Sequence, residues 1–187
     1  MISHEIPPNV IHSPNPSLLV ILLGLMFLST FHNRIDKKAR VSVPSIFRGA
    51  LAGDGFQGVV LFRSYRHQAL EGCGMARMQQ LSQRLDQLAA FSDEQEQLAT
   101  SIFADAEALS FDGDGRIVLS ERLRSHAGLE EEAVFVGQGA TFQIWNPAAF
   151  EAHVAKARQL AKSQKMSLAG LNAGGMATPP ATTGSAS

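Results

Sequence analysis

The feature that most constrains the fold is a short acidic–basic motif that occurs twice. Asp36 and Arg40 lie four residues apart in the first copy, and Asp112 and Arg116 lie four residues apart in the second. The offset between the copies is the same for both pairs, 76 residues. A supersecondary unit present twice, instead of many times, predicts one pseudo-symmetric domain and argues against a solenoid.

The sequence patterns that follow the two copies of the motif are also similar. Three residues with a strand pattern follow each arginine, and Pro44 ends the first of these strands because proline cannot donate to a sheet ladder. A short polar–apolar segment and a β-rich run come next. Closing strands are expected at Ala69–Cys73, the weakest candidate, and at Thr141–Trp145, which alternates cleanly.

Three helices are predicted around these strands. Met78, Leu81, Leu85 and Leu88 recur at helical spacing. Ser92 opens a second helix as a capping residue, and Asn146-Pro147 opens a third. Such apolar stripes usually pack against a core or another subunit, so we assign them no chemistry. The predicted apolar faces are Leu98, Ile102, Ala106 and Leu109 for the second helix, and Phe150, Val154, Ala157 and Ala161 for the third.

The ends of the chain have a different composition. The apolar run Leu18–Leu28 is too short to cross a membrane, which takes about 20 residues, and the first 25 residues lack the basic region of a signal peptide. We expect the folded protein to begin at Met26, with 1–25 a start-site artefact or a disordered extension. Residues 167–187 carry no charge and few large apolar side chains, which predicts a disordered tail.

Charge is unevenly distributed in this chain of formal net charge −1. Residues 32–67 carry seven Lys or Arg against two Asp, whereas residues 91–112 carry six acids and no base. Such segregation can produce a basic face that attracts a polyanion, although two ordinary solvated surfaces explain it equally well. Cys73 is the only cysteine, so one chain can form neither a disulfide nor a thiolate metal site, which fits the cytoplasm.

Motifs for catalysis and for metal binding are missing. Asp112-x-Asp114 does not continue as a calcium loop, because Arg116 and Ile117 stand where an oxygen ligand and a glycine are needed. The six histidines form no His-x-x-x-His pair, and neither a phosphate-binding loop nor a nucleophile elbow occurs. We therefore expect no enzyme, no metal and no cofactor.

The repeated arginines have two interpretations. In an Asp-x-x-x-Arg turn the aspartate can accept backbone N–H bonds while the arginine projects from the tip, where it can bind a phosphate or the O6/N7 edge of guanine. Glycines at 113 and 115 suit a turn with positive φ. A local ion pair that only stiffens the turn explains a single copy better. Two copies, with Arg34, Lys37 and Lys38 beside the first, favour nucleic acid.

Taken together, these motifs resemble the MraZ family of bacterial transcriptional regulators. The resemblance rests on both Asp-x-x-x-Arg turns, on Val-Ser-Val-Pro after the first, on Leu123–Leu129 ahead of Val134–Gln138, and on Phe142–Trp145. It covers about residues 26–164. The sequence departs from the family at Ala39, where a glycine is usual before the arginine.

The resemblance implies an α+β fold of tandem SpoVT/AbrB-like units, each contributing to a swapped-hairpin β-barrel. It places the units at 30–73 and 105–148, with a helical connector at 74–104 and a C-terminal helix at 149–166. It further implies a cytoplasmic, nucleoid-associated homo-oligomeric ring that binds G-rich direct repeats of double-stranded DNA in the promoter of the division and cell-wall gene cluster. Arg40 and Arg116 match the family's motif arginines, and Asp36 and Asp112 match their partners.

Two other functions stay open at this point. A ring-forming scaffold whose basic rim binds a protein would lack preference for one DNA sequence. A toxin–antitoxin antitoxin shares the barrel, but such proteins usually carry one copy of the unit, and the tandem arrangement argues against this class.

Overall fold

The computed structural model describes residues 26–88 and 92–163, so the expectations for 1–25 and 167–187 lie outside the described residues. The described part is a mixture of strands and helices, which confirms the predicted α+β class. Both predicted closing strands are present. The first half contains β1 (Thr30–Arg34), β2 (Arg40–Ser42), α2 (Ser45–Leu51), β3 (Gly58–Arg63), β4 (Ala69–Cys73), α3 (Met75–Leu85) and α4 (Asp93–Ile102). The second half contains β5 (Glu107–Ser110), β6 (Arg116–Val118), α5 (Glu121–Ala127), β7 (Glu132–Gly137), β8 (Phe142–Trp145) and α6 (Pro147–Ser163).

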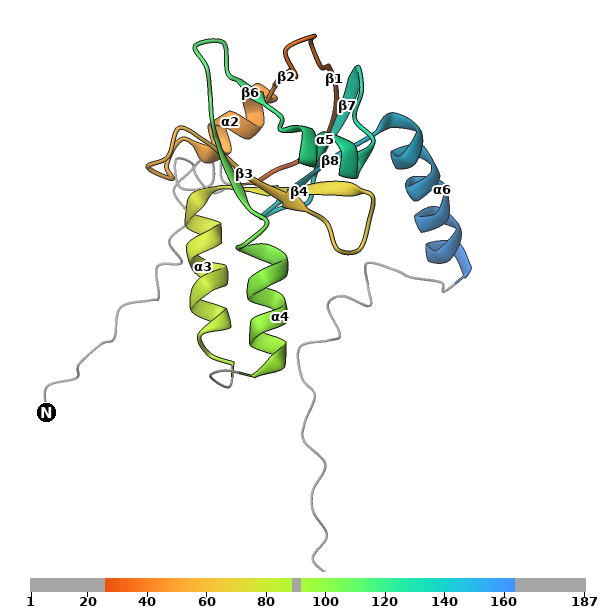
Figure 1. The fold of residues 1–187 in the computed structure, drawn as a ribbon. Helices are drawn as coiled ribbons and strands as arrows, with labels where there is room; N and C mark the ends of the chain where they lie inside the picture. Colours follow the sequence, from red (N-terminus) through yellow and green to blue (C-terminus); the bar gives the residue numbers. More distant parts are fainter. Residues whose placement is uncertain (1–25, 89–91, 164–187) are drawn as a thin grey trace, which may run out of the picture. The chain divides into compact units, whose positions relative to one another are not determined.

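Six strands form one sheet in which the two repeats are interleaved (Figure 1). Its order is β1-β7-β8-β4-β3-β5, and all neighbours are antiparallel. The first strand of each repeat therefore pairs with the third strand of the other. If each strand is replaced by its counterpart in the other repeat, the strand order reads the same in reverse. This is the signature of a pseudo-two-fold axis. The sheet itself ends at β1 and β5, and the remaining strands, β2 and β6, form a separate two-stranded ribbon.

The principal core lies around a phenylalanine of α2. Phe47 is fully buried, and its ring centroid lies 5.2 Å from that of Phe27, 5.5 Å from Phe31 and 5.3 Å from Phe142. Aromatic pairs in this range add to the free energy gained from burying their apolar area. Gly72 is required here because a Cβ at that position would overlap the Phe142 ring. The two repeats thus share one core.

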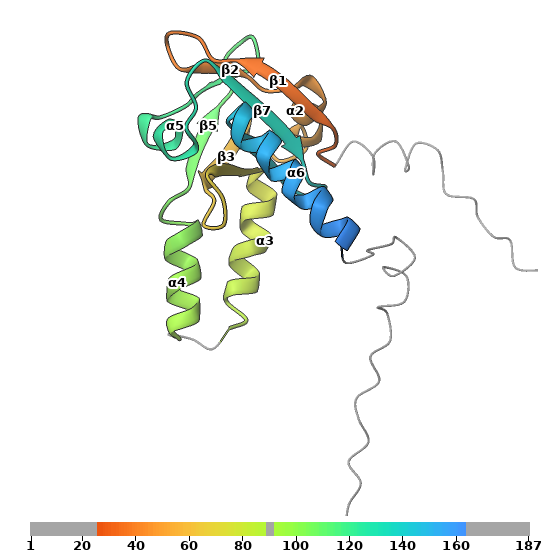
Figure 2. The same ribbon diagram turned by 90° about the vertical axis from the view of Figure 1, so that its right-hand side faces the viewer.

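A smaller core holds the helical hairpin of α3 and α4, which lie side by side and extend away from the sheet in both views (Figure 2). Met78 packs with Val60, Phe62 and Cys73 in this core. Burial raises the pKa of the Cys73 thiol to about 12, so this thiol is inert at neutral pH.

The helix predicted after Ser92 is shorter than expected. The Ser92 hydroxyl accepts a hydrogen bond from Gln95 N, which confirms the cap. However, α4 ends at Ile102, so the placement of Ala106 and Leu109 on its apolar face was wrong. Leu109 lies in β5 opposite Val59 of β3. If α4 continued through Leu109, this edge of β3 would lose the backbone hydrogen bonds that it makes with β5.

The third predicted helix is present as α6, and Asn146 caps it. The Asn146 side-chain oxygen accepts hydrogen bonds from Ala148 N and Ala149 N. None of the helices within 26–88 and 92–163 combines the length and hydrophobicity that crossing a membrane demands.

Candidate nucleic-acid interface

The first Asp-x-x-x-Arg motif forms a closed turn between β1 and β2. Asp36 Oδ1 accepts hydrogen bonds from Lys38 N at 2.8 Å and from Arg40 N at 2.9 Å. Its second oxygen, Oδ2, accepts from Arg40 Nε at 2.7 Å and lies 2.6 Å from Nη2. The aspartate therefore fixes the backbone of the turn and the direction of the arginine together.

The second motif closes its turn through equivalent hydrogen bonds. Asp112 Oδ1 accepts from Asp114 N at 3.0 Å and from Arg116 N at 2.9 Å, and Oδ2 accepts from Arg116 Nε at 2.8 Å. Both motif pairs predicted from the sequence are therefore in contact. Each guanidinium lies against its own aspartate, which is the local ion pair that the sequence left open as one of two interpretations.

Both turns need a left-handed residue just before the arginine. Gly115 has φ 73°, and Ala39, at the same place in the first turn, has φ 58°. Glycine adopts this conformation freely, whereas a Cβ makes it costly. Gly113, which we also expected to need positive φ, does not have it.

The β2–β6 ribbon joins the two turns, which the sequence alone does not place near each other. Arg40 pairs with Val118, Val41 with Ile117, and Ser42 with Arg116. Val41 and Ile117 are buried, at 0% and 1% exposure. Because strand side chains alternate, the other four residues face outward, with the two arginines on one diagonal. We call this surface, formed by Arg40, Ser42, Arg116 and Val118, the ribbon face.

Each arginine keeps hydrogen-bonding capacity on the ribbon face. A guanidinium carries five N–H donors in a planar fork. Asp36 engages Nε and Nη2 of Arg40, which leaves the end of the fork, Nη1 and the second N–H of Nη2, for another acceptor. The side chains of Arg40 and Arg116 are each 32% exposed. A half-exposed fork of fixed direction is suited to bidentate recognition of a phosphate or a guanine edge.

Both aspartates are ionised across the physiological range. Side-chain and backbone hydrogen bonds from Arg40 lower the pKa of Asp36 to about 2. The pKa of Asp112 is also lowered, first by the backbone N–H and then by the side chain of Arg116. The hydrogen bond with Asp112 raises the pKa of Arg116, and Asp36 contributes to that rise through its charge, because the ribbon brings the two turns together.

Further basic side chains surround the first turn. Lys37 and Lys38 are exposed within the turn, and Arg34 is exposed at the end of β1. Arg124 of α5 lines the same hollow as Arg34 and Lys37. Arg48 of α2 lies against Gly115 of the second turn. Arg48 and Arg124 are 76 residues apart and therefore occupy equivalent places in the two repeats. Each turn is thus flanked by an arginine from the other repeat, which the spacing of the motifs alone does not reveal.

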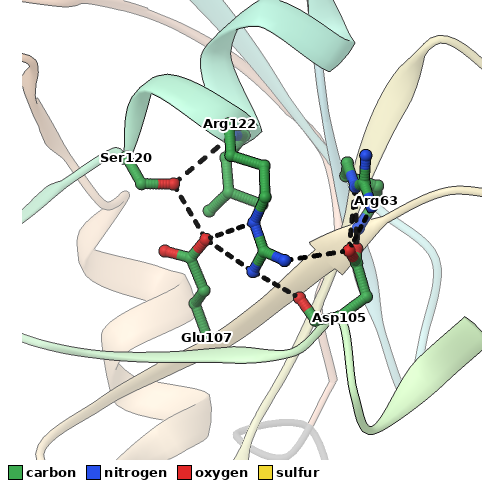
Figure 3. A network of polar contacts seen from close by, with 6 residues as sticks. Arg63, Asp105, Glu107, Ser120 and Arg122 are labelled. Atoms are coloured by element: carbon green, nitrogen blue, oxygen red, sulfur yellow. Dashed lines mark hydrogen bonds and ion pairs between the residues drawn. The ribbon is translucent and has the colours of Figure 1, made fainter. Parts of the chain in front are cut away.

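A second polar cluster lies between β3, β5 and α5 (Figure 3). Asp105 is 7% exposed and accepts hydrogen bonds from the backbone and guanidinium nitrogens of Arg63 at 2.6–3.1 Å. Arg122 spans Asp105 and Glu107, and Ser120 donates to Glu107 at 2.8 Å. Burial alone would raise the pKa of Asp105, but the Arg63 hydrogen bonds outweigh burial and lower it. We assign this cluster a structural role, which the sequence did not predict.

Within 26–88 and 92–163, no three or more His, Cys, Asp or Glu side chains are grouped so that they could hold a metal ion.

Comparison with known proteins decides the family. A family model described as "MraZ protein, putative antitoxin-like" matches residues 102–169. A protein of Rickettsia akari (strain Hartford) named transcriptional regulator MraZ is 43% identical over 147 residues, covering 79% of this chain and 99% of that protein. This chain belongs to the MraZ family. A second protein named transcriptional regulator MraZ, from Pelagibacter ubique (strain HTCC1062), is 46% identical over 143 residues, covering 76% of this chain and 92% of that protein.

The MraZ assignment supports a role in transcription regulation for this chain. The MraZ relatives are named as regulators and not as enzymes.

Proposed function

We propose that this chain is a sequence-specific DNA-binding regulator whose ribbon face contacts double-stranded promoter DNA. The observation that carries the proposal is the pairing of β2 with β6, which puts Arg40 and Arg116 on one outward face with their directions fixed by Asp36 and Asp112. A two-stranded ribbon is narrow enough to enter the major groove, and arginine is the commonest reader of guanine there.

The wider proposal follows the resemblance described above. Residues 30–73 and 105–148 act as two SpoVT/AbrB-like units within each protomer, and the protomers form a ring at the nucleoid in the cytoplasm. The ring binds G-rich direct repeats in the promoter of the division and cell-wall gene cluster. Several ribbon faces on one ring bind more tightly than one face alone, because the first contact raises the effective concentration of the others at the DNA. Repeats about 10 bp apart present equivalent groove faces to successive protomers.

We assign different tasks to the cations on the ribbon face and to those beside it. Arg40 and Arg116 contact guanine edges, because their forks are held in one direction. Lys37, Lys38 and Arg34 contact phosphates, because they are exposed beside the ribbon face. A plot of log affinity against log salt concentration has a negative slope. Loss of either lysine should make this slope less steep by about one unit per ribbon face and leave the sequence preference unchanged.

The test is a gel shift of the full chain on its own upstream DNA, with a scrambled duplex of equal length as competitor. We expect a complex that resists the scrambled competitor and that Arg40→Ala abolishes, with the oligomer unchanged in size-exclusion chromatography. If either duplex displaces the complex equally, the ribbon face is only a basic surface, as expected for a scaffold that binds proteins. Wild-type affinity in Arg40→Ala would show that the assignment of Arg40 is wrong.

A further inference from the structure

The two turns carry opposite charges at one equivalent position. Lys38 and Asp114 are 76 residues apart, and each donates its backbone N–H to the aspartate of its own turn, at 2.8 Å and 3.0 Å. They therefore occupy the same place in two otherwise matching turns. Both side chains are exposed, so neither charge is required by the core.

This difference changes the surroundings of the second arginine. The Asp114 carboxylate lies 2.5 Å from Nη2 of Arg116, while Nε of Arg116 donates to Asp112. Arg116 is thus held by two carboxylates. Arg40 has Asp36 alone within its turn, because the equivalent of Asp114 is a lysine there.

The charges of the two turns differ accordingly. Residues 36–40 contain three basic side chains and one aspartate, a net charge of +2, whereas residues 112–116 contain one arginine and two aspartates, a net charge of −1. DNA phosphates therefore attract the first turn and repel the second.

We propose that Asp114 is a specificity-determining residue of the ribbon face: it competes with DNA phosphate for Arg116, so that the second turn contributes to binding only where a guanine edge is available. This inference rests on the proposed function. Asp114 is 71% exposed in its side chain and can move away when Arg116 engages a better acceptor.

The balance of contacts explains the selectivity. Transferring Arg116 from Asp114 to a phosphate exchanges one exposed ion pair for another, and exposed ion pairs contribute little to binding. The displaced carboxylate then lies near the phosphate and opposes the contact. A bidentate bond to guanine discriminates this base from the others and is made to a neutral acceptor, so it offsets the lost contact with Asp114. Repulsion of this kind is a common source of specificity.

The experiment compares Asp114→Asn with its matched control Lys38→Asn in the full chain. Affinity is measured by fluorescence anisotropy at one fixed salt concentration, on the chain's own promoter duplex and on a scrambled duplex of equal length. Asp114→Asn should tighten binding to the scrambled duplex by about fivefold and binding to the promoter by less than about twofold. Lys38→Asn should weaken both by the same factor, because a phosphate contact is blind to sequence.

The outcomes separate the two proposals. A fall in the promoter-to-scrambled ratio in Asp114→Asn, with no fall in Lys38→Asn, supports the role of Asp114. A wild-type preference for promoter that Asp114→Asn leaves unchanged overturns this role and leaves the proposed function intact. If the wild-type chain itself shows no preference between the duplexes, the proposed function is wrong and this inference is lost with it.

Discussion

Ala39 offers a quantitative test of the turn geometry, because it adopts a conformation that its glycine counterpart adopts freely. Ala39 has φ 58° and Gly115 has φ 73°. A left-handed conformation costs a residue with a Cβ about 1–2 kcal/mol. Replacing Ala39 by glycine removes this cost. Glycine also has more conformational freedom in the unfolded chain, which offsets about 0.4–1 kcal/mol of the stabilisation. Ala39→Gly should therefore stabilise the protein by about 0.5–1 kcal/mol.

Thermal unfolding measures this effect directly. For a chain of this size about 2–4 °C of Tm corresponds to each kcal/mol, so Ala39→Gly should raise Tm by about 1–4 °C. Protomer concentration must be held fixed, because association shifts apparent stability.

Two glycines of the second turn provide matched variants. Gly115→Ala should lower Tm, since it imposes the same strain and places a Cβ against the Arg48 guanidinium. Gly113→Ala should be neutral or slightly stabilising, because no other group lies near that position and its φ is not positive. If Ala39→Gly leaves Tm unchanged or lowers it while Gly115→Ala behaves as expected, the proposed cost of Ala39 is wrong.

Three further predictions concern stability. Asp105→Ala should destabilise by about 1–3 kcal/mol in urea denaturation, because it leaves the backbone N–H of Arg63 without its acceptor, and Asp105→Asn should cost less. Phe47→Ala should cost about 3–5 kcal/mol in the same assay, since the fully buried ring contacts Phe31 of β1 and Phe135 of β7, which belong to different repeats. The pKa of Asp36 is about 2 and those of Asp105 and Asp112 are lowered, so their contribution is complete above about pH 4 and is lost as pH falls towards 2. A Tm that rises on acidification over that range would contradict this assignment.

The sequence predicts the local elements well where one pattern dominates. The repeated motif located both turns, and alternation located β8. Asn146-Pro147 located the start of α6, and Ser92 that of α4. Even the weak pattern at Ala69–Cys73 is a strand, because its residues pair with β3 and β8 on both sides.

Elements that depend on distant partners were harder to predict. Helical spacing continues through Ala106 and Leu109, but β3 supplies a ladder for Glu107–Ser110 and the helix stops before it. The Asp105 network joins residues 42 and 17 positions apart, which no local pattern marks. The exchange of first strands between repeats is likewise invisible to periodicity.

The interleaving of the repeats also explains why a strained alanine is tolerated in the first turn. Leu119 N donates to the carbonyl of Ala39 at 2.9 Å, and Val43 N donates to the carbonyl of Gly115 at 3.0 Å. Each left-handed residue thus presents its carbonyl to the residue that directly follows the β2 or β6 strand of the other repeat. A relaxed Ala39 would lose that bond and disturb the Val41–Ile117 pair beneath the ribbon face. Since these contacts together outweigh a strain of about 1 kcal/mol, the strain persists. The direction of Arg40 is therefore set by its own turn and by β6, and neither repeat positions its arginine alone.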